Sequence, residues 1–145
     1  MWALGIEIPY APKSVGAYAP VFVDGSDLWV SGHTGRSASR PATAGVVGVD
    51  ISIAQAKEHA RLAGLNILAA AVEACDADRL KAVKFLRGYV RASPEFTQHP
   101  EVINAASDLF SKVFPASPAH ARAAIGVPSL PGGATVELEA VLKLY

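Results

Sequence analysis

The chain has 145 residues, of which 51% are hydrophobic and 18% are charged, and its formal net charge at pH 7 is zero. This length suits a single domain with a sizeable core, and we expect residues 1–145 to form one. Zero net charge, without a run rich in Lys and Arg, argues against a nucleic-acid partner. A mean hydropathy of +0.28 is high for a monomer of this size. We therefore expect a homo-oligomer whose interface covers the extra apolar surface.

The compartment is indicated by what the sequence lacks. A single cysteine, Cys75, excludes an internal disulfide and fits a reducing compartment. The N-terminal residues show no basic region followed by a long apolar run, so no signal peptide is expected. The longest apolar stretch, residues 65–72, is interrupted by Asn66 and is too short to span a bilayer. We expect a cytoplasmic protein with no membrane partner.

The first part of the chain predicts an irregular segment and a hairpin. Residues 8–20 hold three prolines and predict an ordered but irregular lead-in. Two short apolar runs, 21–23 and 28–31, flank a turn signal at 24–27 and predict a β-hairpin. Residues 32–48 are rich in Gly, Ser, Thr and Ala and predict a loop.

The middle of the chain predicts helix, strand and helix. Ser52 and Gln55 have the spacing of a capping box, and the helix-favouring composition that follows continues to Cys75. Residues 80–90 predict a long strand. Residues 101–113 place apolar side chains at helical spacing and predict a second helix.

Two strands are expected near the C-terminus, at residues 120–127 and 134–142, joined as a hairpin by a Pro/Gly-rich turn. Side-chain alternation then gives each strand a face to bury against the helices: Ala123, Ile125 and Val127 on the first; Val136, Leu138, Ala140 and Leu142 on the second. The opposite face carries Arg122 and Glu137, and a hairpin register brings these two residues close together.

Two interpretations of this pair stay open. An arginine and a glutamate across antiparallel strands are often only a weak salt bridge, which spacing alone favours. Small residues around Arg122 leave space, so an anion-accepting pocket is the alternative.

Together these elements predict a two-layer α+β domain in the order β-β-α-β-α-β-β, with two helices on one face of a mostly antiparallel or mixed sheet. No remaining element covers the other face. That face must be solvated or covered by a copy of the chain, and the composition favours a copy.

Most other candidate chemistry is unsupported. No metal site is expected, because the four histidines have neither close carboxylate partners nor Cys75 at ligand spacing: His33, His59, His99 and His120. Ser31 and His33 lack the context of a nucleophile elbow. Tyr18, in the irregular lead-in, is either a binding group or an anchoring aromatic. Asn104 could cap its helix, face solvent or bind a ligand.

Several segments carry a family resemblance: residues 11–18, the strand end 28–32, residues 55–66, Asn104, and above all Ala121-Arg122 through Leu130-Pro131 to residues 136–139. They resemble the Rid/YjgF family of reactive-intermediate (enamine/imine) deaminases, also called L-PSP ribonuclease-like. The resemblance covers nearly the whole chain. It implies a chorismate-mutase-like protomer and a homotrimer with sheets inside, helices outside, and a cleft at each subunit interface.

The resemblance also implies roles for particular residues. Arg122 would hold a substrate carboxylate through two parallel hydrogen bonds, and Glu137 would position or activate the attacking water. Tyr18 and Asn104 would line the cleft. Backbone groups near Ser31-Gly32 and Ala124 would orient the carboxylate and the amino nitrogen.

The implied reaction converts a 2-imino acid, of the kind formed from 2-aminoacrylate, into a 2-keto acid and ammonium, with no cofactor or metal. Ala124 stands where many deaminases have cysteine, and His33, where glutamine is frequent, adds a titratable group beside the cleft. Residues 93–100 form a longer segment that could reshape the entrance. A non-catalytic trimer that binds small carboxylates such as 2-keto acids is the alternative, and a ribonuclease is less favoured.

Overall fold

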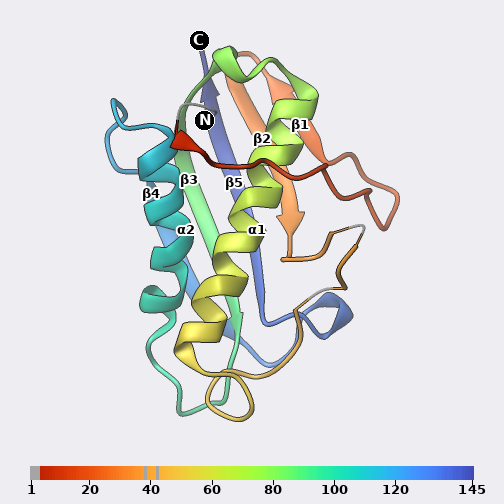
Figure 1. Ribbon diagram of the computed structural model, residues 1–145, viewed down its shortest axis with the longest axis vertical. Helices are drawn as coiled ribbons and strands as arrows, with labels where there is room; N and C mark the ends of the chain where they lie inside the picture. Colours follow the sequence, from red (N-terminus) through yellow and green to blue (C-terminus); the bar gives the residue numbers. More distant parts are fainter. Residues whose placement is uncertain (1–3, 38, 42) are drawn as a thin grey trace.

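The computed structural model describes residues 4–37, 39–41 and 43–145, and its elements follow the predicted order (Figure 1). Within these residues the strands are β1 (Val21–Asp24), β2 (Asp27–His33), β3 (Leu80–Arg91), β4 (Ala121–Val127) and β5 (Val136–Leu144), and the α-helices are α1 (Ile53–Ala74) and α2 (His99–Val113). Short 3-10 helices, Ala77–Arg79 and Pro131–Gly133, precede β3 and β5.

Helix α1 begins where the sequence predicts. The Ser52 hydroxyl accepts a hydrogen bond from the Gln55 backbone N–H at 3.1 Å, and the Gln55 side chain accepts one from the Ser52 N–H at 2.9 Å. This reciprocal capping box satisfies two N–H groups that the helix itself leaves without partners.

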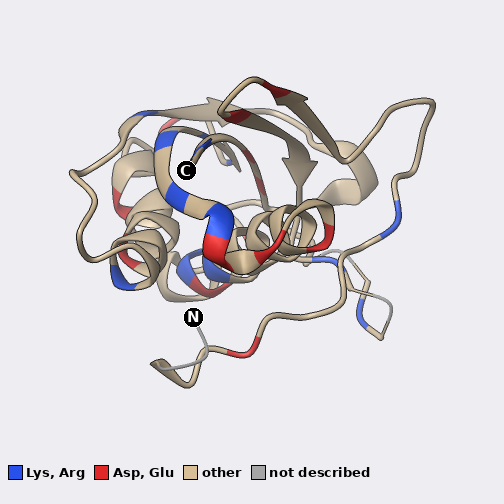
Figure 2. Ribbon diagram, turned by 90° about the horizontal axis from the view of Figure 1, so that it is seen from above, with Lys and Arg blue, Asp and Glu red and all other residues tan. Residues whose placement is uncertain are grey.

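Both helices pack on the same face of the sheet and form the second layer (Figures 1 and 2). The buried side chains of α1 are mostly small, as the alanine-rich stripe predicts: Ala56, Ala60, Ala63, Gly64, Ala69, Ala70 and Ala71. Larger side chains fill the core from α2 and the strands, among them Ile103, Phe110, Leu86 and Leu138. Small residues on α1 allow the helix to lie close to the sheet.

The predicted closing hairpin is wrong. The strand order is β1-β2-β5-β3-β4, so β3 lies between the two strands expected to pair. β4 pairs with β3 in parallel, whereas β5 pairs antiparallel with both β2 and β3. The sheet is therefore mixed, with β1 and β4 as its edges.

Burial explains why β5 is central. One whole face of this strand is buried against the helical layer: Val136, Leu138, Ala140, Leu142 and Leu144. A central position pairs the backbone of such a strand on both sides. The connection from β4 crosses the end of β3, where Ala92 N–H donates to the Val127 carbonyl at 3.2 Å and Arg91 N–H donates to the Thr135 carbonyl at 2.8 Å.

The faces of β4 are also opposite to those predicted. Parallel pairing sets Arg122 beside Leu86, Ala124 beside Gly88 and Gly126 beside Val90. Because Leu86 and Val90 point into the core, Arg122, Ala124 and Gly126 lie on the helical side. Ala123, Ile125 and Val127 lie on the open face instead. The face prediction for the closing strand β5 is correct.

The sheet face away from the helices carries a continuous apolar row across every strand, in the pairing order Phe22, Trp29, Val141, Phe85 and Ala121. Phe22 is 68% exposed and Trp29 52% exposed, both high values for large aromatic side chains. Within the described chain no element covers this row, as expected from the sequence. A patch of this kind marks an interaction surface.

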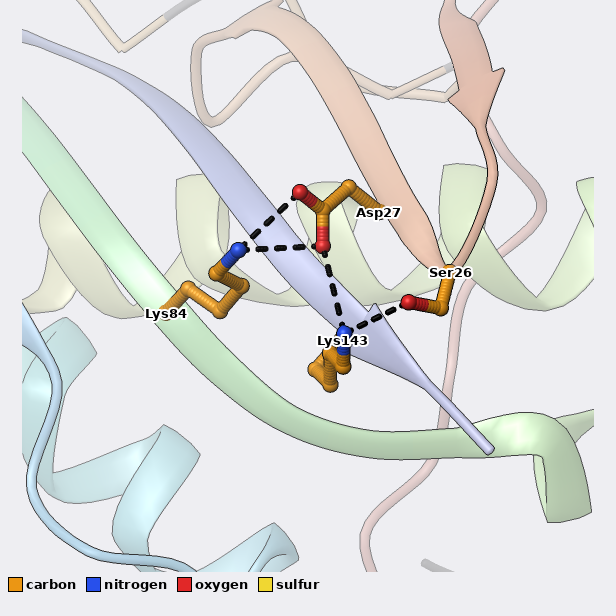
Figure 3. Close-up of polar contacts among 4 residues, drawn as sticks. All are labelled: Ser26, Asp27, Lys84 and Lys143. Atoms are coloured by element: carbon orange, nitrogen blue, oxygen red, sulfur yellow. Dashed lines mark hydrogen bonds and ion pairs between the residues drawn. The ribbon is translucent and has the colours of Figure 1, made fainter.

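One end of the same face carries an ionic cluster, shown in Figure 3. Lys84 Nζ lies 3.0 Å from both carboxylate oxygens of Asp27, and Lys143 Nζ lies 3.7 Å from one of them. Hydrogen bonding from Lys84 lowers the pKa of Asp27. The cluster joins β2, β3 and β5, but its exposed groups contribute little to stability.

The close approach of α2 to β3 can be tested by substitution of Gly88. A Cβ built there would overlap the side chain of Ile103, which is fully buried and has no room to move. We expect Gly88→Ala to lower the free energy of unfolding by about 1–3 kcal/mol, measured by chemical denaturation. A Cβ on Gly126 would overlap the His99 ring just as closely, but His99 is only partly buried and its ring can turn away, so Gly126→Ala is the matched control. Equal stability of both variants would contradict this packing.

Candidate functional site

A pocket of about 640 Å³ opens where the irregular lead-in meets the ends of β2 and β5. Its walls come from the lead-in, β2, the following loop, β5 and the turn before β5. It contains five of the eight residues that the resemblance implicates: Tyr18, Ser31, Gly32, His33 and Glu137. We call this the β2–β5 pocket.

A β-bulge in β2 shapes the wall of this pocket. Val30 lies opposite Ala140 and His33 opposite Leu138, so β2 takes three steps where β5 takes two. Bulges bend a strand and re-aim its side chains, and they are frequent beside active sites. Here the bulge contains Ser31 and Gly32.

Gly32 makes room for the carboxyl group of Glu137. A Cβ built on Gly32 would overlap Glu137 Oε1. Any other residue at position 32 would therefore displace this carboxyl group, which gives the glycine a steric reason beyond backbone freedom.

The Glu137 carboxyl group is half-buried, and no group of the described residues donates a hydrogen bond to it. Burial, and secondarily the nearby Glu139, raise its pKa. Glu139 differs because its carboxylate accepts hydrogen bonds from Arg87 at 2.6 Å and from the Tyr89 hydroxyl at 3.0 Å. Two neighbouring carboxyl groups thus have different environments, and of the two only Glu139 has hydrogen-bond donors among the described residues.

His33 and Ser31 hold the pocket wall in place. The Ser31 hydroxyl donates to the Ala19 carbonyl at 2.7 Å and so ties β2 to the lead-in. His33 Nδ1 lies 2.7 Å from the Ser31 carbonyl, an acceptor, so Nδ1 carries the proton. Burial lowers the pKa of His33, which favours a neutral ring.

Arg122 lies elsewhere in the protomer. Its guanidinium donates to the Ser107 hydroxyl at 3.0 Å and to the Pro100 carbonyl at 3.2 Å, both in α2. Ser107 Oγ also lies 2.9 Å from His120 Nε2. Arginine only donates, so the serine proton points to His120, whose pKa is lowered by burial and by Arg122.

Asn104 and Ala124 belong with Arg122 rather than with the pocket. Asn104 is exposed on α2, one helical turn before Ser107. Ala124 follows Arg122 on the same face of β4. We call Arg122, Ala124, Asn104 and Ser107 the β4-edge cluster. The eight candidate residues therefore form two groups that β3 separates within one protomer.

Three neighbours of these groups were not predicted. Ser107 bonds both Arg122 and His120, and the two residues that it joins to α2 lie more than ten positions further along the chain. Arg36 lines the β2–β5 pocket from a loop whose composition predicts no fixed conformation. In the sequence, the only feature that could have identified Arg36 was its charge, a few residues after the end of β2.

No cluster suited to a metal ion occurs in the part of the chain that the structure describes, where three or more His, Cys, Asp or Glu side chains never gather. His33 and His120 each lie beside a single serine, at Ser31 and Ser107. Among the described helices, none has the length and apolar character to cross a membrane.

Comparisons with known proteins identify the family that shares this architecture. The family model described as "YjgF/chorismate mutase-like, putative endoribonuclease" matches residues 1–141. Protein TCP17 of Trypanosoma cruzi is 35% identical over 143 residues, which cover 97% of this chain and 89% of that protein.

Two solved structures agree with this assignment. Atu1372 of Agrobacterium tumefaciens, described as of unknown function, superposes with a TM-score of 0.89 at 36% identity, covering 99% of this chain and 89% of that one. A "putative endoribonuclease" of Shewanella oneidensis has a TM-score of 0.92 at 27% identity, covering 99% and 95%. The fold is thus the chorismate-mutase-like α+β fold. The chain belongs to the YjgF family, as its motifs indicate.

The contact between Gly32 and Glu137 gives a direct test of the pocket. We expect Gly32→Ala to push the Glu137 carboxyl group toward solvent, so that its pKa falls back toward the ordinary value of 4.5. Titration of the ¹³C-labelled carboxyl resonance measures this, with Glu137→Gln identifying the signal. Gly126→Ala, in β4, should leave the titration unchanged. A Glu137 pKa that is the same in wild type and Gly32→Ala would contradict the geometry.

Proposed function

We propose that this protein hydrolyses small 2-imino acids to 2-keto acids and ammonium in a cleft between protomers, without metal or cofactor. The observation that carries the proposal is the half-buried carboxyl group of Glu137 in the β2–β5 pocket, to which no described residue donates a hydrogen bond. A carboxylate whose pKa is raised is a better proton acceptor for water than an ordinary one. Membership of the YjgF family supports the reaction class.

The proposal takes the second half of the site from a neighbouring protomer. Arg122 lies on the edge strand β4, and the exposed apolar row favours association of the open sheet faces. A cyclic homotrimer with its sheets inside, as the resemblance implies, would set the β4-edge cluster of one protomer beside the β2–β5 pocket of the next. Arg122 and Glu137 would then act in one site although one chain holds them apart.

In this mechanism Arg122 of the partner subunit binds the α-carboxylate of the imino acid through parallel hydrogen bonds. Glu137 accepts a proton as a water molecule adds to the carbon of the protonated imine, which gives a neutral carbinolamine. The same carboxyl group returns this proton to nitrogen and then accepts the hydroxyl proton as the carbon–nitrogen bond breaks. Ammonia takes up that proton and leaves as ammonium, which yields the 2-keto acid and the free carboxylate. Asn104 and Tyr18 would line the cleft, with backbone groups near Ser31-Gly32 and Ala124 orienting the substrate.

The experiments described below also distinguish two other functions. A trimer with this cleft could bind a 2-keto acid without turnover and act as a regulator. Ribonuclease activity has weaker support, because the net charge is zero and basic residues are interspersed with acidic ones along the ribbon (Figure 2). We place the reaction in the cytoplasm, where a chain with a single free cysteine remains reduced.

The proposal is tested by measuring 2-keto acid release from imines generated in situ from serine or neutral amino acids. We expect Glu137→Gln to lower kcat about 100- to 10,000-fold and Arg122→Ala to lower kcat/KM about 10- to 100-fold. In wild type, kcat/KM should rise with pH over the range above 4.5 as Glu137 loses its proton. That limb should be absent in Glu137→Gln.

The controls are Glu58→Gln and Arg61→Ala, which change an exposed ion pair on α1. Both should retain wild-type rates. Absence of acceleration for every imine would reject the proposal. Saturable 2-keto acid binding, lost in Arg122→Ala, would then favour the regulatory trimer, and RNA cleavage surviving both site substitutions would favour a ribonuclease.

A further inference from the structure

The β2–β5 pocket contains a guanidinium group that the proposed mechanism does not use. Arg36 lines this pocket together with Glu137, whereas Arg122 of the same chain does not. Arg36 Nη2 donates to the Lys13 carbonyl at 2.8 Å. Within the described residues no other acceptor binds the guanidinium, and no carboxylate forms an ion pair with it. Most of its five N–H donors are therefore free for a ligand.

A buried amide fixes the backbone that carries Arg36. Asn66, in α1, is only 1% exposed, and its Nδ2 donates to the Thr34 carbonyl at 2.7 Å and to the Arg36 carbonyl at 2.6 Å. Both amide hydrogens are used on this one loop. Burial of a polar side chain is unfavourable unless such bonds form, so these two bonds fix the backbone of residues 34–36. Arg36 is thereby positioned at the pocket wall before any ligand arrives.

The charges and the size of the pocket indicate what Arg36 would bind. Lys13 adds a second positive charge to the lining, while the Glu139 carboxylate is already bound by Arg87. The volume of about 640 Å³ falls among typical ligand sites of about 300–1,000 Å³ and far exceeds that of a three-carbon acid. The pocket thus has room for a longer side chain and a cation to meet its end.

We propose that Arg36 forms an anionic subsite that selects 2-imino acids, and the corresponding 2-keto acids, whose side chain ends in a carboxylate. This inference rests on the proposed function and names its substrate class. The α-carboxylate would bind the arginine of the neighbouring protomer, the imine carbon would lie at Glu137, and the distal carboxylate would reach Arg36.

The test compares kcat/KM for two imines of similar length in the intact oligomer. One is 2-iminoglutarate, made from L-glutamate by glutamate oxidase, and the other is the neutral imine made from L-norvaline by an amino-acid oxidase. We expect wild type to prefer the dicarboxylate and Arg36→Met to reduce that preference about 10- to 100-fold. The neutral imine should be hydrolysed by Arg36→Met within about threefold of wild type. Arg61→Met, which removes an equal charge on α1, should retain the preference.

The outcomes separate this inference from the proposed function. Turnover of both imines with no preference, or a preference unchanged in Arg36→Met, overturns the subsite but leaves the hydrolase standing. Equal loss of both activities in Arg36→Met also overturns it, because Arg36 would then hold the shared α-carboxylate. Should wild type hydrolyse neither imine, calorimetry with 2-oxoglutarate and 2-oxopentanoate decides. Tighter diacid binding that Arg36→Met abolishes supports the subsite, and equal binding overturns it.

Discussion

The position of β3 between β4 and β5 is the constraint on which the site depends. It places Arg122 on the helical side at one edge of the sheet and Glu137 on the open face, with a whole strand between them. Under the proposed function, a single protomer therefore holds two half-sites rather than one site. The proposed chemistry would require a second chain to bring them together, and the exposed apolar row around Trp29 offers a surface for that association.

Each half-site is already organised. In the pocket, the bulge at Ser31 and the missing side chain of Gly32 leave space for the Glu137 carboxyl group, which has no hydrogen-bond donor among the described residues. That arrangement is unfavourable for folding by itself, since a buried carboxylate costs free energy unless it is paired. The large core beneath β5 offsets this cost. At the edge, Ser107 holds the Arg122 guanidinium and leaves part of it available.

The sequence predicted the elements well because their signals are local. Ser52 and Gln55 define a helix start by their own hydrogen bonds, and the turn before β2 lies between two short apolar runs. The pairing of the last strand could not be predicted in this way. A Pro/Gly-rich turn indicates that the chain reverses direction. It does not indicate whether another strand lies between the two strands that the turn joins, and burial of one face of β5 decides this.

The candidate site, like the fold, was only partly predictable from the sequence. Strand alternation and then the family resemblance singled out Arg122 and Glu137, but the hairpin that was to join them does not form, so the proposed site takes them from different protomers. Gly32 could be selected as a backbone position, yet its steric role appears only once Glu137 is placed over it. Arg36 was not selected because its position depends on Asn66, a contact spanning 30 residues.

Mixing two impaired variants tests the central claim most directly. Arg122→Ala and Glu137→Gln chains are co-expressed, and hydrolysis of a neutral 2-imino acid is compared with that of each variant alone. If every site takes its arginine and its glutamate from different protomers, random mixing regenerates about one quarter of the sites and a matching share of wild-type activity. If both residues acted within one chain, the mixture would be as inactive as its components, and that result would contradict the account.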